Sequence, residues 1–117
     1  MAVANHHILI QSKRAGPLVT PQNPSASHDA SAVLVIRNDK GLHTRPSTEL
    51  VRCATRFRSH IQLSYHGMTV NAKSLLGILM LAAGKNAKIT VEATGVDADE
   101  AITALLDLAQ NKFYISF

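Results

Sequence analysis

A histidine and an arginine stand two positions apart in the segment Gly41-Leu42-His43-Thr44-Arg45-Pro46. An imidazole is a competent nucleophile near neutral pH, because its unperturbed pKa is about 6.5. A guanidinium is a planar cation that pairs with phosphate oxygens. The segment joins an expected strand to an expected helix, whose backbone donors and partial positive charge favour a phosphate. The pattern fits a phosphoryl acceptor at His43, but a histidine there is often only a cap or a packed ring, and local chemistry leaves both interpretations open.

The elements that position this segment follow from hydrophobic periodicity. The expected strands are residues 32–36, 61–65, 68–70 and 88–93, and the expected helices are residues 46–57, 75–81 and 97–109. Pro46 suits a first helical turn, and Ser74 is a natural N-cap for the second helix. The order β-α-β-β-α-β-α predicts an α+β fold, in which helices cover one face of a small antiparallel or mixed sheet.

The first 30 residues differ in composition from the rest. They contain three of the chain's four prolines and no hydrophobic periodicity after Ile10. Such a segment cannot bury enough apolar surface to offset its ordering entropy. We therefore expect residues 1–30 to form a flexible leader and residues 31–117 to form one domain.

Composition narrows the function classes. The net charge is +4, the aromatic content is 4%, and no Trp is present. The charge favours an acidic partner, whereas a nucleic-acid binder would need clustered cations or aromatic platforms, so nucleic-acid binding is disfavoured. A single cysteine, Cys53, fits a reducing cytoplasm. No apolar stretch reaches the roughly 20 residues that span a membrane, and we expect a cytoplasmic monomer.

Three ordered motifs carry a family resemblance. The segment 41–46 resembles the active-site signature of HPr, the histidine-containing phosphocarrier family of the bacterial phosphoenolpyruvate-dependent sugar phosphotransferase system. Asn71-Ala72-Lys73-Ser74-Leu75-Leu76-Gly77-Ile78 is similar to the family's regulatory serine segment, and residues 95–101 resemble its turn into the last helix. The resemblance implies an open-faced β-sandwich, in which three helices cover one face of a four-stranded antiparallel sheet.

The resemblance also implies roles for individual residues. His43 would accept the phosphoryl group through Nδ1, and Arg45 would stabilise it together with the backbone amides of Thr44 and Arg45. Thr44 departs from the alanine that is common at this position. Ser74 would match the site of a regulatory kinase, although a plain N-cap explains the same serine and both roles are compatible.

A docking surface is expected beside the histidine. Members of the family bind their partners through the surface around the histidine and the second helix. We therefore assign to this docking surface the residues Thr48, Arg52, Leu75, Leu76 and Leu79. Ile78 and Leu81 are expected in the core instead. Arg45, Arg52 and Arg56 are spaced to share one helix face, which is either a solvated stripe or a surface for an acidic partner.

The resemblance implies a stoichiometric phosphoryl carrier, not an enzyme, with no cofactor and no metal. Its expected partners are enzyme I and the sugar-specific enzyme II A subunits of the phosphotransferase system, with a serine kinase/phosphorylase as a further candidate. The alternative is a regulatory module of the same fold, which would signal nitrogen or carbon status through the phosphorylation of His43 or Ser74 without sugar transport.

Overall fold

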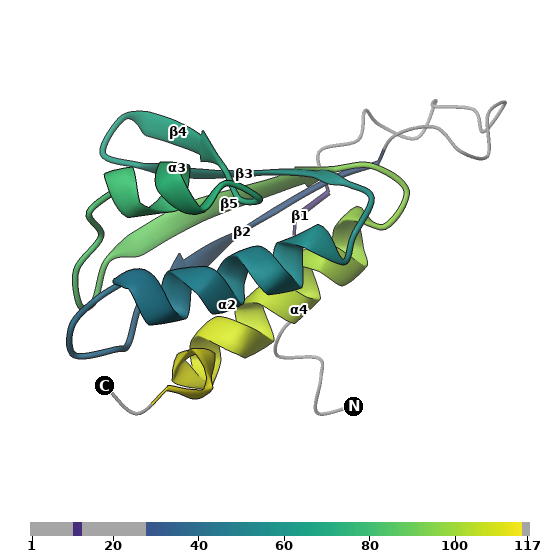
Figure 1. The fold of residues 1–117 in the computed structure, drawn as a ribbon. Coiled ribbons are helices and arrows are strands. Elements are labelled where there is room, and N and C mark those ends of the chain that lie inside the picture. The colour runs from purple at the N-terminus through teal and green to yellow at the C-terminus, as the bar shows by residue number, and fades with distance from the viewer. Residues whose placement is uncertain (1–10, 13–27, 116–117) are drawn as a thin grey trace, which may run out of the picture.

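The computed structural model describes residues 11–12 and 28–115, and within them five strands and three α-helices (Figure 1). The strands are β1 (Gln11–Ser12), β2 (Asp29–Val35), β3 (His60–Tyr65), β4 (Met68–Asn71) and β5 (Lys88–Thr94). The α-helices are α2 (Thr44–Thr55), α3 (Leu75–Met80) and α4 (Ala98–Gln110), followed by the short turn η1 (Lys112–Tyr114).

The strands form one antiparallel sheet in the order β1-β2-β5-β3-β4. The long helices α2 and α4 cover one face of this sheet, while α3 lies beside β4 and packs on α2 (Figure 1). The predicted open-faced sandwich, with four antiparallel strands and three helices, is therefore confirmed, and β1 adds a short fifth strand at the edge of β2.

The core lies between the sheet and the helices. In β2 the residues Ala30, Ala32 and Leu34 are buried, whereas Val33 and Val35 on the opposite face are exposed. The apolar face expected on the last helix is buried as well, and it comprises Ile102, Leu105, Leu106 and Ala109. The buried face of the strand, which repeats every second residue, and the buried face of the helix thus form a single layer of aliphatic side chains.

The first long strand begins earlier than the strand expected at residues 32–36. Strand β2 begins at Asp29, and Asp29 and Ala30 pair with Thr94 and Ala93 of β5. Gln11 and Ser12 also belong to the sheet, through pairing with Ser31 and Ala30. The other leader residues, 1–10 and 13–27, lie outside the described part of the chain, and so do His6 and His7.

Asp97, at the start of α4, ties this helix to the turn before β3. Its carboxylate accepts hydrogen bonds from the amides of Arg58 and Ser59, each at 2.9 Å, and from the Ser59 hydroxyl at 2.6 Å. It makes no capping bond to its own helix. Partial burial acts to raise the pKa of Asp97, but the bonds from Ser59 and Arg58 outweigh it and hold the pKa below its usual value.

Replacing Asp97 with Asn should therefore lower stability in a pH-dependent way. Because its folded-state pKa is lowered, the carboxylate contributes stability above its unfolded value of 3.8, and that contribution is lost as the pH falls through the folded-state value. We expect a loss of about 1–2 kcal/mol near pH 7 in urea unfolding, which shrinks as the pH falls below the unfolded-state value and the carboxylate takes up a proton. Glu100→Gln, an exposed first-turn acid of the same helix, is the control. A loss for Asp97→Asn that does not change with pH would contradict this account.

Candidate functional site

The loop between β2 and α2 is held against the segment that follows α3. The Leu42 amide donates to the Ala83 carbonyl at 2.8 Å, and the Gly41 amide donates to the Asn38 carbonyl at 2.9 Å. Gly41 has a φ of +71°, and a Cβ there would lie 2.5 Å from the Ala83 oxygen and 2.7 Å from the Gly84 Cα. Two backbone segments therefore meet where only a glycine fits.

Asn38 fixes the other side of this loop. It is fully buried, and its side-chain amide donates to the carbonyls of Lys112 at 3.0 Å and Ile115 at 3.3 Å. The turn at Lys112, Phe113 and Tyr114 has three consecutive positive φ angles, which is a costly conformation for residues other than glycine. Asn38 and the buried Phe113 ring stabilise that turn, so the C-terminal end packs directly beneath the loop.

Ser47 ties the loop to the first turn of α2. Its buried hydroxyl donates to the Leu42 carbonyl at 2.9 Å, and its amide donates to the His43 carbonyl at 3.0 Å. The helix starts at Thr44, two residues earlier than predicted, and His43 is its N-cap. The start predicted at Pro46 was too late, because the hydrophobic periodicity of the sequence does not reveal the buried hydrogen bonds that Ser47 makes to the preceding loop.

His43 stands at the helix start, as expected, with an extended backbone and with no capping bond from its side chain. The residue is half-exposed, but its Nε2 atom is buried. The two ring nitrogens are therefore not equivalent, because burial restricts the access of a large reaction partner to Nε2. The ring thus neither serves as a plain cap nor packs entirely into the core.

The first turn of α2 suits an anion. Thr44 and Arg45 are exposed at its surface, and the turn contains no acidic residue. The first amides of a helix have no acceptor within the helix, and the helix dipole adds partial positive charge at that end. A phosphate on His43 would therefore meet backbone donors and the Arg45 guanidinium with no neighbouring first-turn carboxylate to repel it.

Ser74 is the N-cap of α3, as the sequence predicts. Its hydroxyl oxygen accepts a hydrogen bond from the Gly77 amide at 3.0 Å, and its own amide donates to the Asn71 carbonyl at 3.0 Å. The residue is half-exposed, and its hydroxyl oxygen has a structural role as the cap of α3.

Comparisons with known proteins agree with this geometry. The family model described as the phosphotransferase system HPr component phosphorylation site matches residues 30–111. The chain belongs to the HPr family. This family consists of phosphocarriers of the phosphotransferase system, and its members act with other proteins of that system.

Solved HPr structures show the same fold. HPr-C-His from Thermoanaerobacter tengcongensis is 37% identical with a TM-score of 0.71, and the match covers 74% of this chain and 98% of that one. The phosphocarrier protein HPr from Bacillus anthracis is 38% identical with a TM-score of 0.65, over 68% and 94% of the two chains. The catabolite repression protein Crh from Bacillus subtilis is 36% identical with a TM-score of 0.58, over 66% and 88%.

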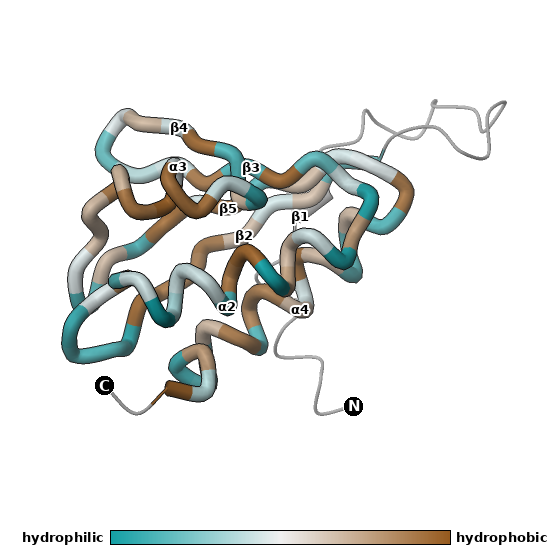
Figure 2. The backbone as a smooth tube through the Cα atoms, in the orientation of Figure 1, coloured by the Kyte–Doolittle hydropathy of each residue, from teal (hydrophilic) through white to brown (hydrophobic). Residues whose placement is uncertain are grey.

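An apolar patch lies on α3 of this HPr-family domain, and Figure 2 shows the hydrophobic character of that helix. Leu75 is 37% exposed and Leu76 is 69% exposed, while Leu79 is half-buried. Ile78 and Leu81 are buried, as expected. Met80, which was not assigned to the surface from the sequence, is 59% exposed and extends the patch.

Helix α2, which packs on α3, carries the expected charged residues. Arg45, Arg52 and Arg56 are all exposed on the helix, which agrees with the expected stripe. Arg52 also pairs with Glu49 at 3.5 Å, and so part of its charge is balanced within the helix. Thr48 is half-buried and its hydroxyl donates to the Thr44 carbonyl at 2.8 Å.

The remaining features of the described residues concern the single cysteine, metal ligands and membrane-spanning helices. Cys53 is buried, and desolvation raises the pKa of its thiol, an effect that Arg56 partly offsets. Within residues 28–115, no cluster of three His, Cys, Asp or Glu side chains could hold a metal ion. No helix in the described part of the chain is long and apolar enough to cross a membrane.

Proposed function

We propose that this chain is a cytoplasmic relay that takes a phosphoryl group onto His43 from enzyme I and passes it to sugar-specific enzyme II A subunits. The observation that supports this best is the place of His43, which stands at the N-cap position of a helix without an acid in its first turn and has a buried Nε2 atom. The family match over residues 30–111 includes this site.

The transfer is an in-line displacement at phosphorus. The lone pair of Nδ1 forms the P–N bond while the bond from phosphorus to the donor breaks, and the donor keeps that electron pair. The Thr44 and Arg45 amides and the Arg45 guanidinium stabilise the charge on the phosphoryl oxygens. In a second displacement, a nucleophile of the acceptor bonds to phosphorus while the P–N bond breaks and its electron pair returns to Nδ1, so the carrier is regenerated and acts as a co-substrate.

The direct test is incubation of the chain with phosphoenolpyruvate and the general phosphotransferase. A phosphohistidine is labile in acid and stable in base, so we expect one such phosphoryl group per chain, followed by its loss to an added enzyme II A subunit. Failure to incorporate phosphate, or an acid-stable product, would reject the relay.

Arg45→Ala should slow labelling without unfolding the domain. Arg45 is exposed in the first turn, so we expect its truncation to leave the core intact while it removes a cation from the phosphorylated state. We expect the initial labelling rate to fall on the order of tenfold, with unchanged circular dichroism. Arg37→Ala is the matched control, since Arg37 is also exposed but lies just after β2, outside the first turn of α2. Equal effects of the two substitutions would contradict a role for Arg45 in holding phosphate.

A regulatory module is the second candidate function, favoured by the match to the catabolite repression protein Crh. The half-exposed N-cap residue Ser74, which directly precedes the exposed leucines of α3, supports phosphorylation at this position as its signal. A chain that accepts phosphate on Ser74 from a serine kinase/phosphorylase, but passes no phosphoryl group to any enzyme II A subunit, would favour this function over the relay. Ser74→Ala should then lose all kinase labelling while His43 labels normally.

A further inference from the structure

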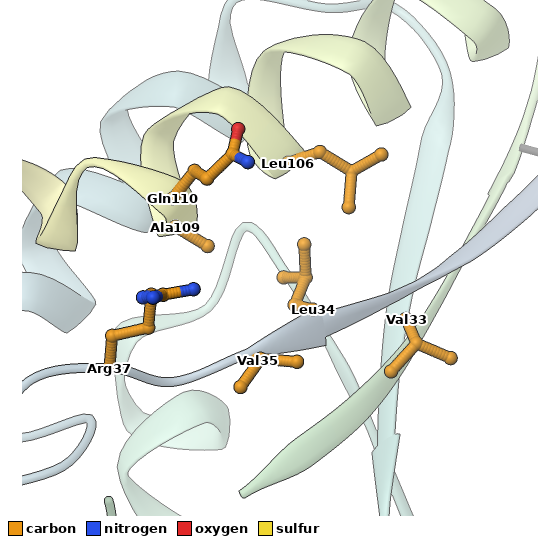
Figure 3. Close-up of a pocket in the computed structure, with 7 residues that line it drawn as sticks. All are labelled: Val33, Leu34, Val35, Arg37, Leu106, Ala109 and Gln110. Atoms are coloured by element: carbon orange, nitrogen blue, oxygen red, sulfur yellow. The ribbon is translucent and has the colours of Figure 1, made fainter. Parts of the chain in front are cut away.

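Helix α4 borders two cavities that lie on different sides of the helix. The smaller cavity, of about 160 Å³, lies between α4 and β2, and Figure 3 shows Leu34 of β2 pointing toward α4 there. Its lining is apolar apart from Arg37 and Gln110. The larger cavity, of about 440 Å³, lies between α2 and α4 and is called here the α2–α4 cavity. Four charged residues line it, namely Glu49, Arg52, Arg56 and Asp107.

The charges of the α2–α4 cavity form one ion pair and leave two groups outside it. Arg52 and Glu49 pair within α2 at 3.5 Å. Arg56 at the C-cap of α2 and Asp107 of α4 line the same cavity, but within residues 28–115 neither makes an ion pair. The lining is therefore neutral overall, with one cation and one anion that come from different helices and do not neutralise each other directly.

Both of these charges lie near Cys53, which is part of the same lining. The Arg56 guanidinium donates to the Cys53 Sγ atom at 3.7 Å and lies 5.8 Å from the centroid of the Phe57 ring. The Asp107 carboxylate accepts a hydrogen bond from the Asn111 side-chain amide at 3.4 Å. Burial raises the pKa of the Cys53 thiol, the charge of Arg56 lowers it, and the charge of Asp107 raises it again. The thiol thus responds to a cation on one side of the cavity and to an anion on the other.

Apolar groups complete the lining. Ala104 and Leu108 of α4 are half-buried, and Cys53 of α2 is buried. Tyr114, which is 72% exposed, also lines the cavity, and its amide donates to the Asn111 carbonyl at 2.8 Å. The volume of the cavity falls in the range of small-molecule sites, which combine an apolar lining with a few charged or polar groups.

We propose that the α2–α4 cavity binds a free α-amino acid with an apolar side chain. The carboxylate of the ligand pairs with the Arg56 guanidinium and its ammonium group pairs with Asp107, while its side chain contacts Ala104 and Leu108. A ligand that is only anionic would meet Glu49 and Asp107, and one that is only cationic would meet two arginines. A zwitterion matches both charges, because it carries the two opposite groups on one carbon.

This site is separate from the phosphoryl site. Arg56 follows Arg45 by eleven positions, which corresponds to about 16 Å along a helix. A ligand as small as an amino acid therefore leaves the His43 loop uncovered. We expect His43→Ala to bind the amino acid as the native chain does, so the outcome does not depend on the proposed relay. Loss of binding in His43→Ala would contradict this placement.

Titration of the full chain with L-leucine, followed by NMR of the backbone amides at constant pH and salt, tests the proposal. The amides of Cys53 and Leu108 should shift and reach saturation, while the amide of Leu34, in the other cavity, should not shift. Shifts that never saturate, or that are equal at Leu34 and Cys53, would overturn the proposal.

Two analogues of leucine separate its charges. Leucinamide lacks the carboxylate and 4-methylpentanoate lacks the ammonium group, so each leaves one charged group of the cavity without its partner. We expect both to bind about tenfold more weakly than L-leucine. Equal affinity of L-leucine and either analogue would show that the cavity does not recognise a zwitterion.

Substitutions assign each charge to its partner. Arg56→Gln and Asp107→Asn should each weaken the binding of L-leucine about tenfold. Arg56→Gln should not weaken leucinamide further, and Asp107→Asn should not weaken 4-methylpentanoate further, because the matching ligand group is already absent. The matched controls are Arg58→Gln and Glu100→Gln, which change exposed residues outside the cavity and should bind L-leucine normally. Equal effects of Arg56→Gln and Arg58→Gln would reject the assignment.

Discussion

Replacing His43 with alanine is expected to abolish phosphoryl transfer to the chain while the domain stays folded. The imidazole supplies the nucleophilic nitrogen, and no other histidine of the described residues stands at a helix start. Its side chain makes no capping bond, so we expect a change in the free energy of unfolding within about 1 kcal/mol. Incorporation of phosphate from phosphoenolpyruvate, measured by intact mass, should fall from about one group per chain to background.

His60→Ala and His66→Ala are the matched controls for this substitution. Both histidines are exposed; His60 begins β3, and His66 stacks on Tyr65 in the turn to β4, with ring centroids 4.0 Å apart. Neither lies in the loop that precedes α2, and each variant should label as the native chain does. If His43→Ala were still labelled and either control lost its labelling, the phosphorylation site would lie on the sheet and the proposed mechanism would be rejected.

Gly41→Ala is expected to damage both the stability and the reactivity of the protein. The new Cβ would lie 2.5 Å from the Ala83 oxygen and 2.7 Å from the Gly84 Cα, in addition to the cost of a φ of +71°. The loop must move away, which disturbs the adjacent bond from the Leu42 amide to Ala83. We expect a loss of about 2–4 kcal/mol in urea unfolding. The labelling rate should fall at least tenfold, since a displaced nucleophile reacts poorly.

Gly67→Ala separates the steric effect from the backbone effect. Gly67 has a similar φ of +80°, but its added Cβ would have no heavy atom within 4 Å. Only the conformational cost of about 1–2 kcal/mol applies, and the labelling rate should not change because the residue lies in the turn between β3 and β4. If both glycine variants lost equal stability and kept full labelling, close contact at Gly41 would not position the site.

Features that arise from contacts near in sequence could be predicted from the sequence. The alternation in β2, the apolar face of α4 and the Ser74 cap follow from strand and helix periods and from bonds between residues a few positions apart. The same holds for His43 at the beginning of a helix, where the local order of Gly41, His43 and Pro46 marks a strand-to-helix loop.

Other contacts could not be predicted, because they are formed between residues that lie far apart in the sequence. Asp97 looks like a cap of its own helix, yet its carboxylate bonds to Ser59, 38 positions away. Asn38 looks like a turn residue, yet it is buried and binds the Ile115 carbonyl, 77 positions away. Met80 could not be distinguished from the buried residues Ile78 and Leu81, because the rotation of such a short helix against α2 decides which of its side chains are exposed.

By itself, the sequence determined the elements, their order, and a histidine and an arginine at the start of one helix, because these depend on residue type and short-range spacing. Only the tertiary structure decided which ring nitrogen of His43 is buried, that Ser47 ties the loop to the helix, and that Gly41 lies against Ala83. Those features arise when the segment after α3 and the C-terminal turn pack beside the loop, and the spacing of residues along the chain does not encode such packing.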